Sequence, residues 1–226
     1  MKLIPALSIK EGRVAIVEDG NYVFLRNVEG QFRNPVNLIR EWKFSGEEVF
    51  VLDIDGLERN SPDLDTVKRI AAYKDVWLDA GVDDADSMMD LFVSDASRVV
   101  MGTICLESLV ELEKALDISE NIIISVGYDG GVVSPDPSIA GLTLEEIMEK
   151  LGKIENLRNG MLFDLGGIRD GKRMDLETIS KIAGQFKEFY VAGHINREDI
   201  PALEDAGISG AIIDFRKMED MLDEGT

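Results

Sequence analysis

Eight short runs of β-branched and other apolar residues, separated by helix-length segments, constrain the fold of this chain more than any other feature of its sequence. Most of the runs are continuously apolar, as expected for parallel strands that are covered on both faces. Strand–helix alternation repeated eight times predicts a parallel sheet with crossover helices. The predicted strands are Lys2–Leu7, Glu48–Asp53, Val76–Asp79, Arg98–Gly102, Asn121–Val126, Gly160–Asp164, Phe189–Ala192 and Gly210–Asp214.

Such a sheet either stays open as a doubly wound sheet or closes into a barrel, and two features favour closure. The pattern Gly-x-Gly-x-x-Gly, which binds dinucleotides in open sheets, does not follow the first run. The second run ends in Leu52-Asp53 and the sixth in Phe163-Asp164, which is a faint repeat between the two halves. The length of 226 residues also suits one barrel. We therefore predict an α/β fold, a single (β/α)8 or TIM barrel over residues 1–226.

Local signals mark the first turns of two helices. Pro35 fits the first turn of a helix that runs through Ser45. Thr143 followed by Glu146 forms a capping box, in which each side chain accepts a hydrogen bond from the backbone of the other residue. These residues predict where the helices begin.

Composition bounds the partners and the setting of the chain. It has 24 Lys and Arg against 44 Asp and Glu, a formal net charge of −20. A surface of this charge repels nucleic acid and anionic membranes, so we expect neither as a partner. The single cysteine, Cys105, allows no intrachain disulfide. With no signal-peptide pattern and no apolar run of membrane-spanning length, we expect a cytoplasmic protein.

In a barrel of this type the chemistry lies where the strands end and the following loops begin. Five predicted strands end at or near an aspartate, and the only histidine, His194, follows the seventh. An aspartate at such a place also caps the next helix, but a whole ring of carboxylates costs stability unless something compensates. Oxygen ligands converging on one mouth suit Mg²⁺ or Mn²⁺. The expected metal ligands are Asp53, Asp79, Asp164 and Asp214.

Segments in order along nearly the whole chain resemble the (β/α)8-barrel isomerases of histidine biosynthesis and their cyclase relatives. They are Ile4–Val14, Val51–Gly56, Val100–Thr103, Gly141–Glu146, Phe163–Asp164 with Arg169–Gly171, and Gly207–Ile213. The resemblance implies a ribulose-phosphate-binding type of barrel and an Amadori rearrangement of the phosphoribosyl substrate ProFAR. It also implies substrate-binding positions at Ser8, Gly102, Thr103, Arg169 and Gly193.

The chain departs from the family where the resemblance places two catalytic aspartates, at the ends of the first and fifth strands. Ser8 and Gly127 stand there, and neither supplies a titrating group near neutral pH. Asp129 lies two residues beyond Gly127, so it projects from the same face of the chain. The loop after the sixth strand is longer than in the family, with Gly166-Gly167-Ile168 ahead of Arg169.

The turns that hold phosphate in the family are also changed. The expected glycines after the third and seventh strands have become Asp79-Ala80-Gly81 and Gly193-His194, and Asp214 replaces a glycine after the eighth. A carboxylate a few ångströms from a phosphate costs on the order of several kcal/mol at an effective dielectric constant of about 20. These turns do not suit a doubly phosphorylated substrate.

Three functions remain open. The first is a divergent, metal-assisted enzyme that acts on a small molecule in the barrel mouth, with Asp164, Asp129, Asp53 and His194 as catalytic residues. The second is retained isomerisation, with Asp129 and Asp164 as the acid pair and Arg169 facing an anion. The third is a non-catalytic barrel that binds a protein partner or a second copy of itself.

Overall fold

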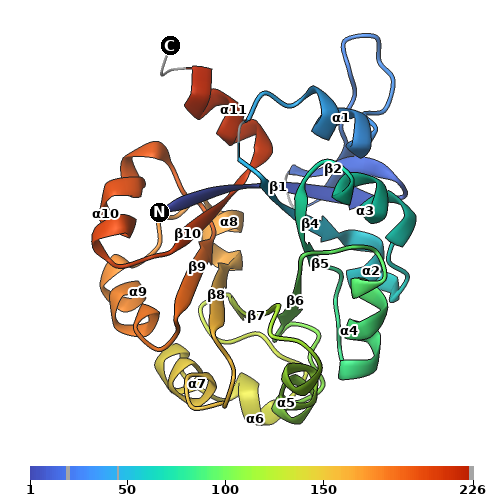
Figure 1. Ribbon diagram of the computed structural model, residues 1–226. Helices are drawn as coiled ribbons and strands as arrows, with labels where there is room; N and C mark the ends of the chain where they lie inside the picture. Colours follow the sequence, from blue (N-terminus) through green and yellow to red (C-terminus); the bar gives the residue numbers. More distant parts are fainter. Residues whose placement is uncertain (19–20, 45, 224–226) are drawn as a thin grey trace.

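A closed barrel of eight parallel strands forms the centre of the molecule (Figure 1). The computed structural model describes residues 1–18, 21–44 and 46–223. Neighbouring strands pair in chain order, and the last pairs with the first, which confirms the predicted (β/α)8 barrel. The barrel strands are β1 (Lys2–Lys10), β4 (Glu48–Asp53), β5 (Asp75–Asp79), β6 (Arg98–Gly102), β7 (Ile122–Tyr128), β8 (Asn159–Asp164), β9 (Glu188–Ala192) and β10 (Gly210–Asp214).

Helices cover the outside of the barrel and follow the strands in turn (Figure 1). None of them, within the described residues, is long and apolar enough to cross a membrane. They are α1 (Pro35–Glu41), α2 (Ile54–Arg59), α3 (Leu64–Ala71), α4 (Ala85–Phe92), α5 (Leu109–Ile118), α6 (Pro137–Ala140), α7 (Leu144–Leu151), α8 (Leu165–Asp170), α9 (Leu176–Ala183), the 3₁₀ turn η1 (Arg197–Asp199), α10 (Ile200–Asp205) and α11 (Phe215–Asp223).

The first strand differs from its prediction. It continues three residues past Leu7 and turns into two antiparallel strands, β2 (Arg13–Glu18) and β3 (Asn21–Phe24). Ser8 therefore lies within β1 rather than at its end, paired with Leu52 of β4 on one side. The other seven predicted strands agree with the structure within two residues at each end.

The helix starts are confirmed, whereas two other local expectations are wrong. Pro35 opens α1, and Thr143 with Glu146 forms the capping box of α7. However, α1 ends at Glu41, and Ser45 lies outside the described residues. The expected loop after β8 is the short helix α8, because Asp164 caps it by accepting a hydrogen bond from the backbone of Gly167.

Large apolar side chains fill the lower part of the barrel interior. They alternate along each strand with the residues that face the helices, as the period of two requires. The rings of Trp77 and Tyr190 meet edge to face at 4.8 Å, a contact worth about 0.5–1.5 kcal/mol beyond burial. The interior cluster comprises Ile4, Phe50, Trp77, Val100, Ile123, Met161, Tyr190, Ala192 and Ile212.

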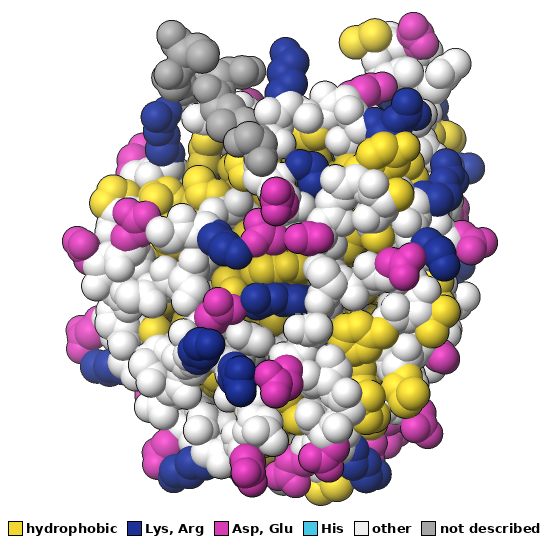
Figure 2. Space-filling model, in the orientation of Figure 1, with side chains coloured by type: hydrophobic (Ala, Val, Ile, Leu, Met, Phe, Trp, Pro, Cys, Tyr) yellow, Lys and Arg dark blue, Asp and Glu magenta, His cyan; other side chains and the backbone are white. Residues whose placement is uncertain are grey.

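Charged groups close the amino-terminal end of the barrel. Arg98 donates hydrogen bonds to Glu188 (3.0 Å) and to the hydroxyl of Tyr190 (3.1 Å), and its guanidinium lies 4.6 Å from the ring centre of Trp77. Figure 2 shows side chains of both charges over the middle of the barrel and around its rim. Ion pairs between these charged side chains stabilise the amino-terminal end of the barrel. The predicted site lies at the opposite end, where the strands finish.

The close approach of α2 to the end of β5 provides a test of the packing. A Cβ atom added at Gly56 would lie 2.5 Å from the carbonyl oxygen of Ala80. We expect Gly56→Ala to lower the free energy of unfolding by about 1–3 kcal/mol, because overpacking forces the backbone to shift. Urea unfolding followed by circular dichroism measures the change.

Gly184→Ala is the matched control. Gly184 ends α9 with a helical backbone, and nothing lies within 4 Å of an added Cβ. We expect no loss of stability, or a gain below about 1 kcal/mol. Equal stability of the two variants would contradict the contact between α2 and β5.

Candidate functional site

Two of the predicted catalytic carboxylates lie together at the ends of β7 and β8. A Cβ atom added at Gly166 would lie 2.9 Å from Oδ1 of Asp129 and 3.8 Å from Oδ1 of Asp164, so both carboxylates flank this glycine. Arg169 donates a hydrogen bond of 2.5 Å to Oδ2 of Asp129 and another to Asp170. The hydrogen bonds to these two carboxylates raise the pKa of the Arg169 guanidinium, which remains a cation.

Glycines make room for the Asp164 carboxylate. Its Oδ1 accepts a hydrogen bond of 2.8 Å from the backbone of Gly167, where a Cβ atom would lie only 2.2 Å from Oδ2. A Cβ atom added at Gly193, after β9, would lie 2.3 Å from Cε of Met174 and 3.3 Å from Cβ of Asp164. The structure thus brings together Asp129, Asp164, Arg169 and Gly193, four of the residues singled out in the sequence.

Asp53 and Asp214 are engaged by their own loops. Asp53 is fully buried and accepts three backbone hydrogen bonds, from Asp55, Gly56 and Asp63. Burial raises its pKa, and these hydrogen bonds oppose the rise. Asp214 receives two side-chain hydrogen bonds from Arg216, at 3.0 and 3.1 Å. Both carboxylates hold loops in place, so the predicted catalytic role of Asp53 has no support in its geometry.

The predicted metal site does not form a cluster. Asp53, Asp79, Asp164 and Asp214 end different strands, and all four accept hydrogen bonds from backbone N–H groups or from Arg216. No group of three or more His, Cys, Asp or Glu side chains in the described part of the chain is placed to hold a metal ion. The expectation of a four-aspartate ligand set is therefore not met by this arrangement.

Asp79 is the most perturbed acid of the mouth. Its side chain points into the barrel, it is 4% exposed, and its Oδ1 accepts one long hydrogen bond, 3.3 Å, from the backbone of Gly81. Burial raises the pKa of the Asp79 carboxyl to about 7, which the hydrogen bond from Gly81 only partly offsets. The acid is therefore partly neutral under physiological conditions.

His194 lies at the mouth but is not placed as a cation. Its Nδ1 is 3.4 Å from Nζ of Lys217. Burial lowers the pKa of His194, and the positive charge of Lys217 lowers it further. A neutral imidazole beside an ammonium group accepts a hydrogen bond from it. Among the described residues no carboxylate hydrogen-bonds this ring to orient it as a general base.

The resemblance places catalytic aspartates at Ser8 and Gly127. Gly127 is covered by a neighbouring side chain, and Ser8 lies within a strand. A Cβ atom added at Gly127 would lie 2.5 Å from Cγ1 and 2.8 Å from Cδ1 of Ile104, so the Ile104 side chain occupies that direction. Thr103 is buried, accepts a hydrogen bond from the backbone of Gly127 and donates one to Val133. Ser8 is half-buried within β1. The contacts of Thr103 and Ile104 fix the loop after β6 against the end of β7.

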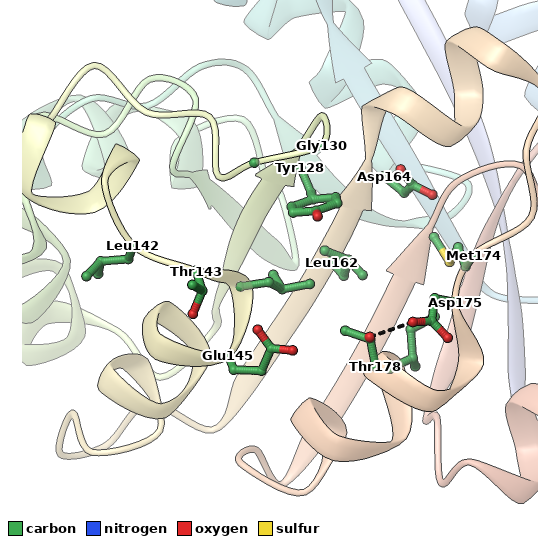
Figure 3. Close-up of a pocket in the computed structure, with 13 residues that line it drawn as sticks. Tyr128, Gly130, Leu142, Thr143, Glu145, Leu162, Asp164, Met174, Asp175 and Thr178 are labelled. Atoms are coloured by element: carbon green, nitrogen blue, oxygen red, sulfur yellow. Dashed lines mark hydrogen bonds between the residues drawn. The ribbon is translucent and has the colours of Figure 1, made fainter.

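A cavity of about 470 Å³ opens between α7 and α9 beside the ends of β7 and β8 (Figure 3). Asp164 and Tyr128 line it from the strands, and Glu145, Asp175 and Thr178 line it from the helices. Thr178 donates a hydrogen bond of 2.7 Å to Asp175. None of the described lining residues is Lys, Arg or His. The cavity has acidic groups and three hydroxyl groups set among apolar walls, which Leu142, Leu144, Leu162, Met174 and Ile179 supply.

The part of this cavity that the helices supply was not predicted from the sequence. The predicted site residues lie at strand ends or in the segments that follow them, whereas Glu145 lies in the first turn of α7 and Asp175 caps α9. The capping box of α7 was a visible signal, because it placed the first turn of that helix beside Thr143. Nothing in the sequence indicated that the first turns of α7 and α9 face one cavity.

The fold and the position of these groups define the class: a (β/α)8 barrel whose polar groups gather at the carboxyl-terminal mouth, as in enzymes of this architecture. The family model described as histidine biosynthesis protein matches residues 2–214. The chain therefore belongs to the histidine biosynthesis protein family.

Several curated relatives carry the name 1-(5-phosphoribosyl)-5-((5-phosphoribosylamino)methylideneamino) imidazole-4-carboxamide isomerase. The protein from Halothermothrix orenii is 26% identical over 225 residues, which cover 94% of this chain and 92% of the relative. Those from Herpetosiphon aurantiacus and Pyrococcus furiosus are 28% and 25% identical, with 91% and 87% of the relative covered. The chain is similar to these isomerases over nearly its whole length.

The buried acid predicts how stability depends on pH. The Asp79 carboxyl has an ordinary pKa of 3.8, reached in the unfolded chain, and a pKa of about 7 in the folded protein. Between these values the unfolded state loses the proton and the folded state keeps it, so the free energy of unfolding falls as pH rises from about 4 to about 7. Asp79→Asn should remove this loss and raise stability above pH 7 by on the order of 4 kcal/mol.

Urea unfolding of both proteins at pH 5 and pH 8 measures this effect. The gain from the substitution should be about 1.5 kcal/mol at pH 5 and largest, about 4 kcal/mol, at pH 8. Asp90→Asn, at an exposed position on α4, is the control and should change stability by less than about 0.5 kcal/mol. A gain that is the same at both pH values would contradict the assignment.

Proposed function

We propose that this chain is a divergent enzyme of its family that transfers protons on a small polar molecule bound at the ends of β7 and β8. The observation that carries the proposal is that two carboxylates, Asp129 and Asp164, both lie next to Gly166. Asp164 also lines the cavity between α7 and α9. Carboxyl groups on two sides of a bound molecule serve as general acid and general base.

Arg169 orients the pair. Its hydrogen bond of 2.5 Å fixes one oxygen of Asp129, and α8 presents the Asp164 carboxylate through its first turn. Because α8 supplies both Arg169 and the backbone that Asp164 caps, one short helix aligns both acids. In this proposal Asp129 and Asp164 exchange protons with the substrate, and Arg169 is a positioning residue.

The chemistry of the cavity indicates the class of substrate. Three carboxylates, Glu145, Asp164 and Asp175, line it with no described cation among the lining residues. A phosphate there would face like charges at a cost on the order of several kcal/mol. The names of the relatives specify two phosphoribosyl groups, whereas this cavity favours a neutral or cationic molecule with several hydroxyl or amino groups, such as an unphosphorylated amino sugar.

The family reaction through its usual positions is not part of this proposal. Ser8 and Gly127 supply no titrating group near neutral pH, and the Ile104 side chain covers the side-chain direction of Gly127. A divalent cation is not part of it either, because the mouth aspartates are not clustered as ligands. Retained isomerisation of ProFAR would have to use the Asp129 and Asp164 pair.

A non-catalytic barrel is the second candidate function. The observation that favours it is that several mouth carboxylates are already bound by backbone N–H groups or arginines, as at Asp53 and Asp214. In that case the mouth is a remnant of the fold, and function lies in contact with another protein or a second copy.

The test is solvent hydrogen exchange at the carbon next to the carbonyl of glucosamine and of ribose, followed by NMR in deuterium oxide. The wild-type protein should catalyse exchange on the amino sugar faster than on ribose, because the acidic cavity favours a cation. Asp164→Asn and Asp129→Asn should each lower the rate by about 10²-fold to 10⁴-fold, the usual contribution of general acid–base catalysis.

Glu149→Gln is the control, because Glu149 lies on the exposed part of α7 and pairs with Lys153. It should leave the rate unchanged. Exchange that is absent with both sugars, or that survives Asp164→Asn, would contradict the proposal and favour the non-catalytic barrel. ProFAR turnover that is lost in Asp164→Asn would instead show that the family reaction survives through the relocated pair.

A further inference from the structure

Inside the barrel, a layer of polar and small residues lies above the apolar interior cluster, toward the carboxyl ends of the strands. Trp77, Val100 and Ile123 point into the barrel. Because side chains alternate along a strand, the residues two positions further on face the same way. On β5, β6 and β7 these residues are Asp79, Gly102 and Ser125.

On β4 and β8 the same step reaches Leu52 and Phe163, which belong to the neighbouring layer, whereas on β1 and β9 it reaches small side chains. The residues two positions beyond Ile4 and Tyr190 are Ala6 and Ala192. Barrel interiors are filled by layers of four side chains from alternate strands. This layer therefore consists of Asp79, Ser125 and two alanines, which leave room at the axis.

Gly102 enlarges that room. It pairs in register with Ser125, and a Cβ atom added to it would meet only the backbone nitrogen of Ile104, at 3.9 Å. The Ile104 side chain lies over Gly127, one step above Ser125, and forms a roof. We call the space bounded by Asp79, Gly102, Ser125 and this roof the interior chamber.

Ser125 points to an occupant. It is 1% exposed, and its Oγ atom has no hydrogen-bond partner among the described residues. An unsatisfied buried hydroxyl costs about 1–3 kcal/mol, so native proteins pair such groups with protein, water or ligand. The hydroxyl of Ser125 can both donate and accept.

Asp79 sets the chemistry of that occupant. It receives only the hydrogen bond from Gly81, and no ion pair to it exists within the described part of the chain. The shift of the Asp79 pKa comes from burial and the Gly81 hydrogen bond, with no cation among its causes, and the negative charges of Asp79 and Asp83 add to the burial that raises the pKa of the Cys105 thiol. A buried carboxylate without a counter-ion favours a positively charged donor.

We infer that the interior chamber is a binding subsite for one primary ammonium group, held by Asp79 and Ser125. A primary ammonium carries three N–H donors, which matches the carboxylate and the hydroxyl. Anions are repelled by Asp79, and a divalent metal would lack ligands, because no three acidic, His or Cys side chains in the described part of the chain are grouped to hold one. The inference concerns binding alone and does not depend on the proposed proton transfer at Asp164.

The test is thermal unfolding of the full chain at pH 8 with methylammonium chloride. Potassium chloride at the same concentrations controls for screening of the net negative charge. Tetramethylammonium chloride controls for the donors, because it has no N–H group and is larger. Near saturation, methylammonium should raise the Tm by about 3 °C above both controls, since a ligand bound only by the folded state stabilises it.

Variants locate the binding. Gly102→Ala fills the chamber with a methyl group and meets no close atom, so it should fold and lose the specific rise in Tm. Asp79→Asn should lose it as well, and Ser125→Ala should reduce it. Asp90→Asn, on the exposed part of α4, should keep the full rise.

Each outcome decides the inference. A rise no larger than that with potassium chloride would overturn it and leave the chamber to water. A specific rise that persists in Gly102→Ala would also overturn it, because the amine would then bind elsewhere. A rise lost in Asp164→Asn but kept in Asp79→Asn would place the amine in the cavity between α7 and α9, against this inference and in support of the substrate class proposed for that cavity.

Discussion

The parallel pairing of β10 with β1 is the contact on which the rest of the structure depends. It removes both exposed edges of the parallel sheet, which would otherwise present unpaired backbone groups. It also brings the ends of the first and last strands, which are about 200 residues apart in sequence, to one mouth. Closure places all eight strand ends around a common axis, whereas the contacts of the candidate site are local, as between Asp129 and Arg169 at the ends of the adjacent strands β7 and β8.

Closure also places several carboxylates around one opening. Carboxylates on several strands would repel one another if all stood ionised around one opening. The structure disposes of them in different ways: Asp53 binds backbone N–H groups, Asp214 binds Arg216, and Asp129 binds Arg169. Asp79 is buried with a single hydrogen bond, from Gly81, and burial raises its pKa. The remaining acid, Asp164, faces the cavity, which is why the proposed chemistry centres on it.

Small residues decide where space remains inside the molecule. Gly166 and Gly167 allow two carboxylates to approach α8, and Gly102 leaves the interior chamber open. In each case a Cβ atom would either clash or fill the space. The side-chain direction of Gly127, in contrast, is already filled by Ile104. The glycines of this barrel therefore do not share one function, although several of them lie at strand ends.

The sequence by itself determined the barrel, because continuous apolar runs are stable as strands only when both faces are covered, and eight of them alternating with helices have few ways to achieve this. It also determined the first turns at Pro35 and Thr143, which rest on local hydrogen bonds and on a fixed backbone angle. Only the tertiary structure decided what each strand-end aspartate does. Asp53 and Asp79 look alike in sequence and both are buried, but Asp53 accepts three backbone hydrogen bonds from the segment that follows it, whereas Asp79 accepts one, from Gly81. The cavity between α7 and α9 was decided in the same way, by packing two helices that do not adjoin in the chain.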